Sequence, residues 1–316
     1  MRRRVALLAL LLSPVPALMV PLKPDPTYIV AAAQEYPVTG MVLSVDRARN
    51  AFTASIQAIP GFMPAMAMPF EVRQATDLDG LAPGAVVEFT LVVDAGSSHA
   101  ERIRVVRYQS VEQDPLAASR LKLLTELAGL SRRSVFAKGG TAPRKVLAVG
   151  ETVPDFRLID QNRRPVSLAS LRGKVAAINF IYTTCPLPNF CLRIANNFGV
   201  LQKRFKAQLG RNLVLLTVTF DPVHDTPEVL ERYAGRWEAD PTTWHFLTGP
   251  VRDVQTVCRL FGVDFFPDEG LMNHSLHTAL IDRQGKMVAN IEGNNFTADQ
   301  LGDLINAVLK PTPLNR

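Results

Sequence analysis

One segment organises the chain: Thr183-Thr184-Cys185-Pro186-Leu187-Pro188-Asn189-Phe190-Cys191. The apolar run Val175–Tyr182 before it is typical of a buried strand. Apolar residues at helical spacing after it predict an amphipathic helix that Gly210 would cap: Ile194, Phe198, Leu201, Phe205 and Leu209. Both cysteines therefore lie on a strand-to-helix turn, at the positive end of a helix, which favours thiolates. Thiolates there either exchange disulfides or bind soft metals.

Length and composition describe a globular chain of two domains. It has 316 residues, of which 47% are apolar and 20% are charged. The formal net charge is +6 and the isoelectric point is about 9.4. Because no basic run is interleaved with aromatic residues, we expect a mildly basic surface and no nucleic-acid partner.

The amino terminus has the order of an export signal. Arg2–Arg4 precedes the apolar run Val5–Leu12, and small residues follow up to Ala17. We expect residues 1–20 to be a cleaved signal peptide or an anchor, and 21–35 to be a tether. In either case the body of the chain is exported to the periplasm, free or anchored to its membrane. Three cysteines in an exported chain make a pair plus one, and the pair oxidises unless metal or a reductant holds it.

Two regions with different sequence patterns follow the tether. Residues 36–107 predict a small all-β barrel of the OB type, because short strands alternate with Gly-bearing turns. Its expected strands are Val38–Val45, Asn50–Ile56, Val86–Val93 and Ile103–Val106. Residues 108–148 predict a helix and a basic linker.

Residues 149–311 predict an α/β domain with a thioredoxin-type fold. Its expected elements are a hairpin over Phe156–Leu168, the cysteine-bearing strand and helix, a strand over Leu213–Phe220, a helix that begins at Thr226-Pro227, a strand over Trp244–Leu247, a helix over Val251–Phe261, strands over Leu276–Ile281 and Met287–Ile291, and a last helix opened by a capping box at Thr297–Gln300. This order is that of thioredoxin with one extra strand and helix.

The spacing of the thiols and a histidine downstream bear on their chemistry. Disulfide oxidoreductases of this fold have Cys-x-x-Cys, whereas Cys185 and Cys191 have five residues between them, two of which are proline. Thioredoxin-like enzymes also have a proline beside the cysteines, and His274 stands there instead. Two thiolates and one imidazole form a donor set suited to copper in either oxidation state.

These residues resemble the Sco/SenC family of copper chaperones for cytochrome oxidase assembly. The resemblance covers about Val149 to Leu309, and its anchors are Tyr182–Cys191, Phe220–Pro227 and Asn273–Ser275. It implies copper, as Cu(I) or Cu(II), bound by Cys185, Cys191 and His274. It also implies delivery of copper to an accepting oxidase subunit rather than enzymatic catalysis, although a thiol-reductase role has also been proposed for such proteins. The family's usual cysteine spacing is three residues, and the longer form here resembles a branch of it.

The first domain has a soft-ligand cluster of its own. Met66 and Met68 are two residues apart, so they share one face of a strand. Together with Tyr36–Gly40, the segment Met63–Phe70 resembles the CusF-like periplasmic copper-binding domain. That family adds a histidine from the preceding strand, which Ala54–Ile59 lacks, and an aromatic residue where Met63 stands. The resemblance implies either a second copper site at Met63, Met66 and Met68, exchanging metal with other copper carriers, or a barrel that only docks a partner.

Other polar residues have simpler roles. Asp221 follows a strand near the predicted site and either orients a ligand or forms a turn. His224 is expected to be solvated, and His277 to point away from His274 along the strand. Cys258 shares an apolar helical face and is expected to be a buried structural thiol.

Three other functions compete with metal delivery. A thiol-disulfide reductase would act on the cysteines of an oxidase subunit with Cys185 as its nucleophile. It would not need His274. A thiol peroxidase is disfavoured because the turn before Cys185 lacks the proline of that class. A redox or copper sensor is the third.

Overall fold

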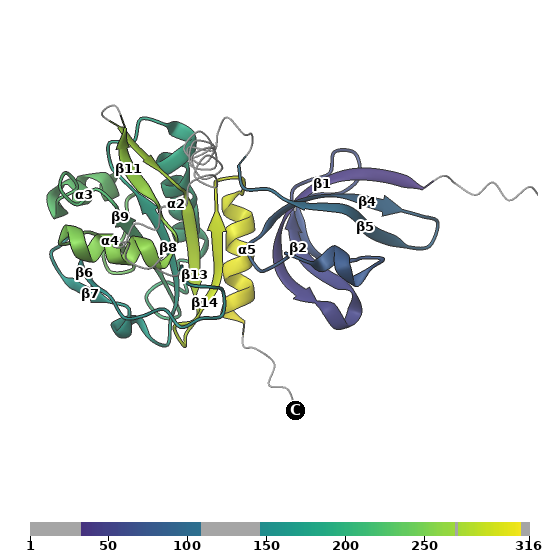
Figure 1. The fold of residues 1–316 in the computed structure, drawn as a ribbon, viewed down its shortest axis with the longest axis horizontal. Coiled ribbons are helices and arrows are strands. Elements are labelled where there is room, and N and C mark those ends of the chain that lie inside the picture. The colour runs from purple at the N-terminus through teal and green to yellow at the C-terminus, as the bar shows by residue number, and fades with distance from the viewer. Residues whose placement is uncertain (1–32, 109–145, 269–270, 311–316) are drawn as a thin grey trace, which may run out of the picture. The chain divides into compact units, whose positions relative to one another are not determined.

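A computed structural model describes residues 33–108, 146–268 and 271–310 (Figure 1). The predicted signal peptide or anchor, most of the tether, and the helix and linker expected within 108–148 lie almost wholly outside these residues. Within the described ranges, no helix is both long and apolar enough to cross a membrane.

The first domain is an all-β unit, as the sequence predicts. Its strands are β1 (Gln34–Asp46), β2 (Ala51–Ile56), β3 (Met66–Glu71), β4 (Val86–Val93) and β5 (Ser98–Val105). All neighbours are antiparallel, in the order β3-β2-β1-β4-β5. A bridge between Val72 and Ala100 joins the chain after β3 to β5, so the two edges of the sheet meet. Phe52, Phe70 and Phe89 pack together at its centre, which gives this small domain its own core.

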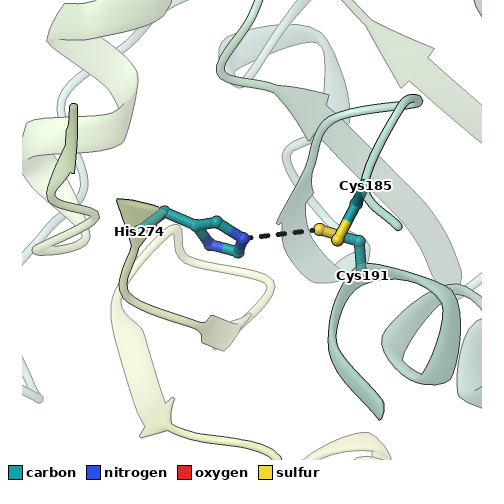
Figure 2. Close-up of side chains that lie close together, drawn as sticks. All are labelled: Cys185, Cys191 and His274. Atoms are coloured by element: carbon teal, nitrogen blue, oxygen red, sulfur yellow. Dashed lines mark hydrogen bonds between the residues drawn. The ribbon is translucent and has the colours of Figure 1, made fainter. Parts of the chain in front are cut away.

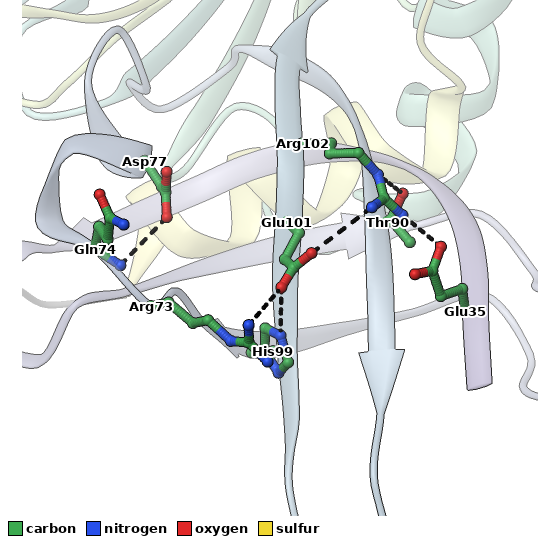
Figure 3. A network of polar contacts seen from close by, with 8 residues as sticks. All are labelled: Glu35, Arg73, Gln74, Asp77, Thr90, His99, Glu101 and Arg102. Atoms are coloured by element: carbon green, nitrogen blue, oxygen red, sulfur yellow. Dashed lines mark hydrogen bonds and ion pairs between the residues drawn. The ribbon is translucent and has the colours of Figure 1, made fainter. Parts of the chain in front are cut away.

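A polar network on β5 ties the strands of this domain together (Figure 3). Glu101 bonds His99 Nε2 at 2.9 Å and pairs with Arg73 at 3.1 Å. The next residue, Arg102, pairs with Glu35 on β1 and donates from Nε to the Thr90 hydroxyl at 3.2 Å. Arg102 has a positive φ of 55°, and the register of β4 and β5 shifts beside it. The bulge therefore turns adjacent side chains toward different partners.

The second domain is built on a mixed sheet with the order β10-β9-β8-β13-β14. Its strands are β8 (Val175–Ile181), β9 (Leu213–Thr219), β10 (Trp244–Leu247), β13 (His277–Ile281) and β14 (Met287–Glu292). The first three are parallel, and β13 is antiparallel to β8 and β14. Every residue of β8 and β9 is buried, which explains why both strands are mostly apolar in sequence.

Helices cover both faces of this sheet. They are α2 (Arg193–Arg204), α3 (Pro227–Ala234), α4 (Val251–Leu260) and α5 (Ala298–Leu309). Helices α2 and α5 contact each other, α5 contacts β8 and α2 contacts β9, while Phe261 at the end of α4 meets Phe180. Because Phe180 alternates with Asn179 along β8, its ring points to one face only, and α4 covers that face. The capping box predicted at Thr297 and Gln300 is present at the start of α5.

Two hairpins complete the domain. The hairpin of β6 (Arg157–Ile159) and β7 (Pro165–Ser167) is the predicted one. The hairpin of β11 (Phe265–Asp268) and β12 (Leu271–His274) was not predicted, and it carries His274 at the end of β12. The helix after the cysteines also ends earlier than expected. Phe205 caps α2, and Gly210, with a φ of 77°, belongs to the turn that enters β9.

Candidate metal centre

The fold brings Cys185, Cys191 and His274 together (Figure 2). Cys185 lies in the turn after β8. Cys191 lies in a single wide helical turn, Pro188–Leu192, that precedes α2. His274 comes from β12, on the other side of the group. Two prolines hold the chain out of regular helix between the thiols, and Phe190 keeps a non-helical backbone (φ −111°, ψ −113°).

The three potential ligand atoms lie within 4.8 Å of one another. Among the residues that the structure describes, this is the group of His, Cys, Asp and Glu side chains that could hold a metal ion. The Cys191 sulfur is 3.6 Å from His274 Nε2. His274 Nδ1 lies 3.0 Å from the Ser275 carbonyl, which can only accept, so Nδ1 carries the hydrogen. Nε2 is then free to offer its lone pair toward the sulfurs, as a metal ligand must.

The two thiols differ in their readiness to ionise. A hydrogen bond from Cys191 holds the pKa of Cys185 well below its usual range. Burial, followed by the bond and the charge of Cys185, raises the pKa of Cys191. Cys185 is half-buried and Cys191 is fully buried. The pair therefore favours one accessible thiolate at Cys185 beside a buried thiol at Cys191 that keeps its proton.

A buried carboxylate anchors the first half of the cysteine loop. Asp225, only 1% exposed, follows β9 and accepts hydrogen bonds from the backbone N–H of Thr183 (3.1 Å) and from its hydroxyl (2.5 Å). The Thr219 hydroxyl donates to the same carboxylate at 2.5 Å. Burial is the main cause that raises the pKa of Asp225, against the effect of these donors. The turn that presents Cys185 is thus fixed to the end of the neighbouring strand.

The loop between β14 and α5 anchors the second half. The side-chain amide of Asn294, a residue 2% exposed, donates to the Asn189 carbonyl at 2.5 Å. Arg193, just after Cys191, donates to the Phe296 carbonyl at 3.2 Å. The loop is therefore held near both of its ends, and the segment between Cys185 and Asn189 has fewer anchors.

Aromatic rings enclose the imidazole. Phe220 lies 4.6 Å from the His274 ring, and Tyr182 meets it edge-on at 5.7 Å and 86°. Phe265 stacks on Phe220 at 5.3 Å. Burial, and next the charge of Cys185, raise the pKa of Tyr182, so its phenol stays protonated. These rings limit the directions that the imidazole can take and exclude water from its far side.

The other residues singled out from the sequence lie apart from this group or contact it indirectly. Asp221 bonds His224 Nδ1 at 2.9 Å, and its backbone N–H bonds the Thr219 hydroxyl at 3.0 Å. His224 is exposed, as expected, and His277 bonds Asn290 at 3.0 Å on β14. Cys258 is fully buried in α4, as expected for a structural thiol. The anchoring contacts therefore come from Asp225 and Asn294, which the sequence reasoning missed.

In the first domain, Met66 and Met68 lie on β3, with Ala67 between them. Met66 is 46% exposed, and Met68 and Met63 pack partly against the barrel core. The register places Ile56 opposite Met66 and Ala54 opposite Met68 on β2, where a histidine ligand would have to come from. The histidine that the described first domain does contain, His99, lies on β5 and bonds Glu101. A site here would depend on thioether sulfur alone, and it stays a prediction.

Fold and site together define a thioredoxin-like protein with a dithiol–imidazole donor set, joined to a small β domain. Residues 145–310 match the family model described as SCO1/SenC, and residues 35–105 match that of the copper binding periplasmic protein CusF. The chain belongs to the SCO1/SenC family, and its first domain is CusF-like. The resemblances seen in the sequence are confirmed.

Relatives match the second domain. A SCO2-like protein of Rickettsia typhi is 30% identical over 151 residues, which are 45% of this chain and 69% of that protein. The mitochondrial SCO1 protein of Saccharomyces cerevisiae is 26% identical over 148 residues, 45% of this chain and 48% of that protein.

Among solved structures, yeast Sco1 with copper bound is 26% identical and covers 53% of this chain and 92% of its own, with a TM-score of 0.44. BsSco, described as a member of the Sco family of cytochrome c oxidase assembly proteins, is 24% identical and covers 53% and 98%, with a TM-score of 0.45.

Proposed function

We propose that this protein is an exported copper metallochaperone that delivers copper for assembly of a cytochrome c oxidase copper centre. The observation that carries the proposal is the approach of two sulfurs and one imidazole nitrogen within 4.8 Å. Copper accepts this donor set in both oxidation states. Membership of the SCO1/SenC family supports the choice of acceptor, and the match to the copper binding periplasmic protein CusF supports the choice of metal and a periplasmic location.

Transfer would proceed by exchange of ligands. The half-buried Cys185 thiolate meets an incoming copper carrier first, and the buried Cys191 and His274 complete the site behind it. Delivery would run in reverse, with a thiolate of the acceptor replacing Cys185. The acceptor, by this reasoning, is an oxidase subunit whose own copper ligands include cysteines.

Copper titration of the reduced protein tests the proposal. Wild type should retain copper, and His274→Ala and Cys185→Ala should lose it. His224→Ala is the matched control, because His224 is an exposed histidine bonded only to a neighbouring turn in the contacts described above. If His274→Ala keeps copper affinity within a few-fold of wild type, the three-ligand site is wrong.

The metal count per chain separates the roles of the two domains. One copper per chain, lost in His274→Ala, leaves the CusF-like domain without a tight site. Two coppers would assign the second to Met63, Met66 and Met68, and a variant with these three changed to Leu should then bind one.

A thiol-disulfide reductase is the second candidate, and the lowered pKa of Cys185 beside Cys191 favours it. Such a reductase would need both cysteines and would be indifferent to His274. Turnover of a disulfide substrate at equal rates by wild type and His274→Ala, without retained copper, would favour this function over metal delivery.

A further inference from the structure

Three polar side chains lie side by side in the middle of the second domain's sheet. Asn179 on β8 has Thr217 directly opposite on β9 and Thr278 directly opposite on β13. Because side chains alternate between the two faces of a strand and opposite residues share a face, all three point to the same side of the sheet. Each has an exposed fraction of 0%. We call these three residues the polar row.

The polar row points toward α2. The Trp244 ring nitrogen Nε1 donates to the Thr217 hydroxyl at 2.9 Å, and the same ring packs on Phe198 of α2, with the ring centroids 6.1 Å apart. Phe180, the residue after Asn179, points to the opposite face of β8. The polar row is therefore enclosed in the core between the sheet and α2.

Most of the hydrogen-bonding capacity of the polar row is unused. Among the described residues, neither the amide nitrogen nor the amide oxygen of Asn179 has a partner, and the Thr278 hydroxyl has none either. Thr217 accepts the Trp244 N–H, which leaves its own hydroxyl hydrogen to give. The residues two before and two after Asn179 on β8 are alanine and isoleucine, which have no polar side-chain atom. Buried polar groups without partners cost stability, and native proteins satisfy nearly all of them.

We propose that the polar row is a binding site for internal water, with at least one water molecule held between the Asn179 amide and the Thr278 hydroxyl. An internal water typically makes about three hydrogen bonds. The Asn179 amide can give two hydrogens and accept at its oxygen, and each threonine hydroxyl can give one, so the polar row supplies enough partners. An ion fits less well, because the polar row carries no charge and a buried ion without a charged partner is strongly disfavoured.

The three strands of the polar row all lead to the metal centre. The chain passes from β8 into the turn of Cys185 and from β9 into the turn of Asp225, and β13 begins shortly after His274. A water bound by side chains of β8 and β13 links the strand before the first thiol to the strand after the imidazole. We therefore expect this water to stabilise the strands that position the three ligands. The inference needs no copper and stands apart from the proposed function.

A high-resolution crystal structure of the reduced, metal-free full chain tests the site directly. We expect ordered water within hydrogen-bond distance of both the Asn179 amide and the Thr278 hydroxyl in wild type. We expect none in Asn179→Leu, because leucine has a similar volume and offers no polar atom. Wild-type density that shows no water at the polar row overturns the inference.

Unfolding in urea tests whether the water couples the two residues. Thr278→Val removes one partner of the water, so it should raise the unfolding equilibrium constant about fivefold in the wild-type chain. It should change little in the Asn179→Leu background, where the water is already lost. Thr248→Val is the matched control, because Thr248 is also buried (3% exposed) but follows β10, which is two strands away from β8.

The control should have the same effect in both backgrounds. If Thr278→Val also has equal effects in both backgrounds, or if it stabilises the wild-type chain, the inference is wrong. If Asn179→Leu does not fold, the wild-type crystal structure and the sign of the Thr278→Val effect decide between a hydrated and a dry polar row.

Discussion

Asp225 accepts hydrogen bonds from both the N–H and the hydroxyl of Thr183, two residues before Cys185. Asp225→Ala would leave these donors buried without partners. Each such group costs about 1–3 kcal/mol, so we expect a loss of about 2–4 kcal/mol in the free energy of unfolding, measured with urea. Copper affinity should fall as well. Asp240→Ala is the control, since Asp240 bonds the exposed Thr242; an equal loss there would contradict the anchoring role.

The raised pKa of Asp225 gives stability a pH dependence of known sign. The folded state binds its proton more tightly than the unfolded state, whose pKa lies near the ordinary 3.8. The contribution of Asp225 to stability therefore falls as pH rises from that value through the folded pKa, and is constant above it. Asp225→Asn does not titrate, so it should gain stability relative to wild type across this window. Urea unfolding at several pH values measures the difference in stability between the two proteins. If Asp225→Asn instead gained stability relative to wild type as the pH falls through this window, the prediction would be wrong.

Copper binding should release a proton. Burial keeps Cys191 protonated near neutral pH, whereas Cys185 is already a thiolate. A metal that binds both sulfurs must displace the Cys191 proton, so we expect about one proton per copper and an affinity that rises about tenfold per pH unit. Calorimetry in two buffers with different heats of ionisation counts the protons. A count near zero or two would show that the thiols share their charge differently.

The three cysteines should react with alkylating agents in a fixed order. Cys185 is a half-buried thiolate and should react first. Cys191 and Cys258 are both fully buried, and burial raises the pKa of Cys258 to about 12. Peptide mapping after short exposure to iodoacetamide measures the order, and a sample unfolded in urea should show all three labelled. Early labelling of Cys258 in the folded protein would mean that α4 opens readily.

The sequence predicted most of the second domain because its signals are local. The buried run of β8, the helix that follows and the capping box at Thr297 depend on neighbours a few residues apart. His274 was found because it stands where thioredoxin-like enzymes have proline. Cys185 and Cys191 were found because their spacing departs from Cys-x-x-Cys.

The residues that hold the site in place were missed for a physical reason. Asp225 and Asn294 lie in loops, far in sequence from the turn that they anchor, and an Asp or Asn in a loop ordinarily indicates only a turn. The β11–β12 hairpin was missed because Pro267 argues against a strand. Asp221 was favoured over Asp225 because it directly follows the strand.

The anchors at the two ends of the cysteine loop determine the side from which copper can enter and leave the site. Thr183 and Asn189 are fastened to different parts of the domain, and Cys185 is the ligand nearest to solvent. Cys185 is then the first ligand to bind incoming metal, and Cys191 and His274 are the last ligands to release it. A Cys185→Ser variant should consequently take up copper from a carrier more slowly in stopped-flow transfer, whereas loss of a ligand that served only for retention would change the rate of unloading alone.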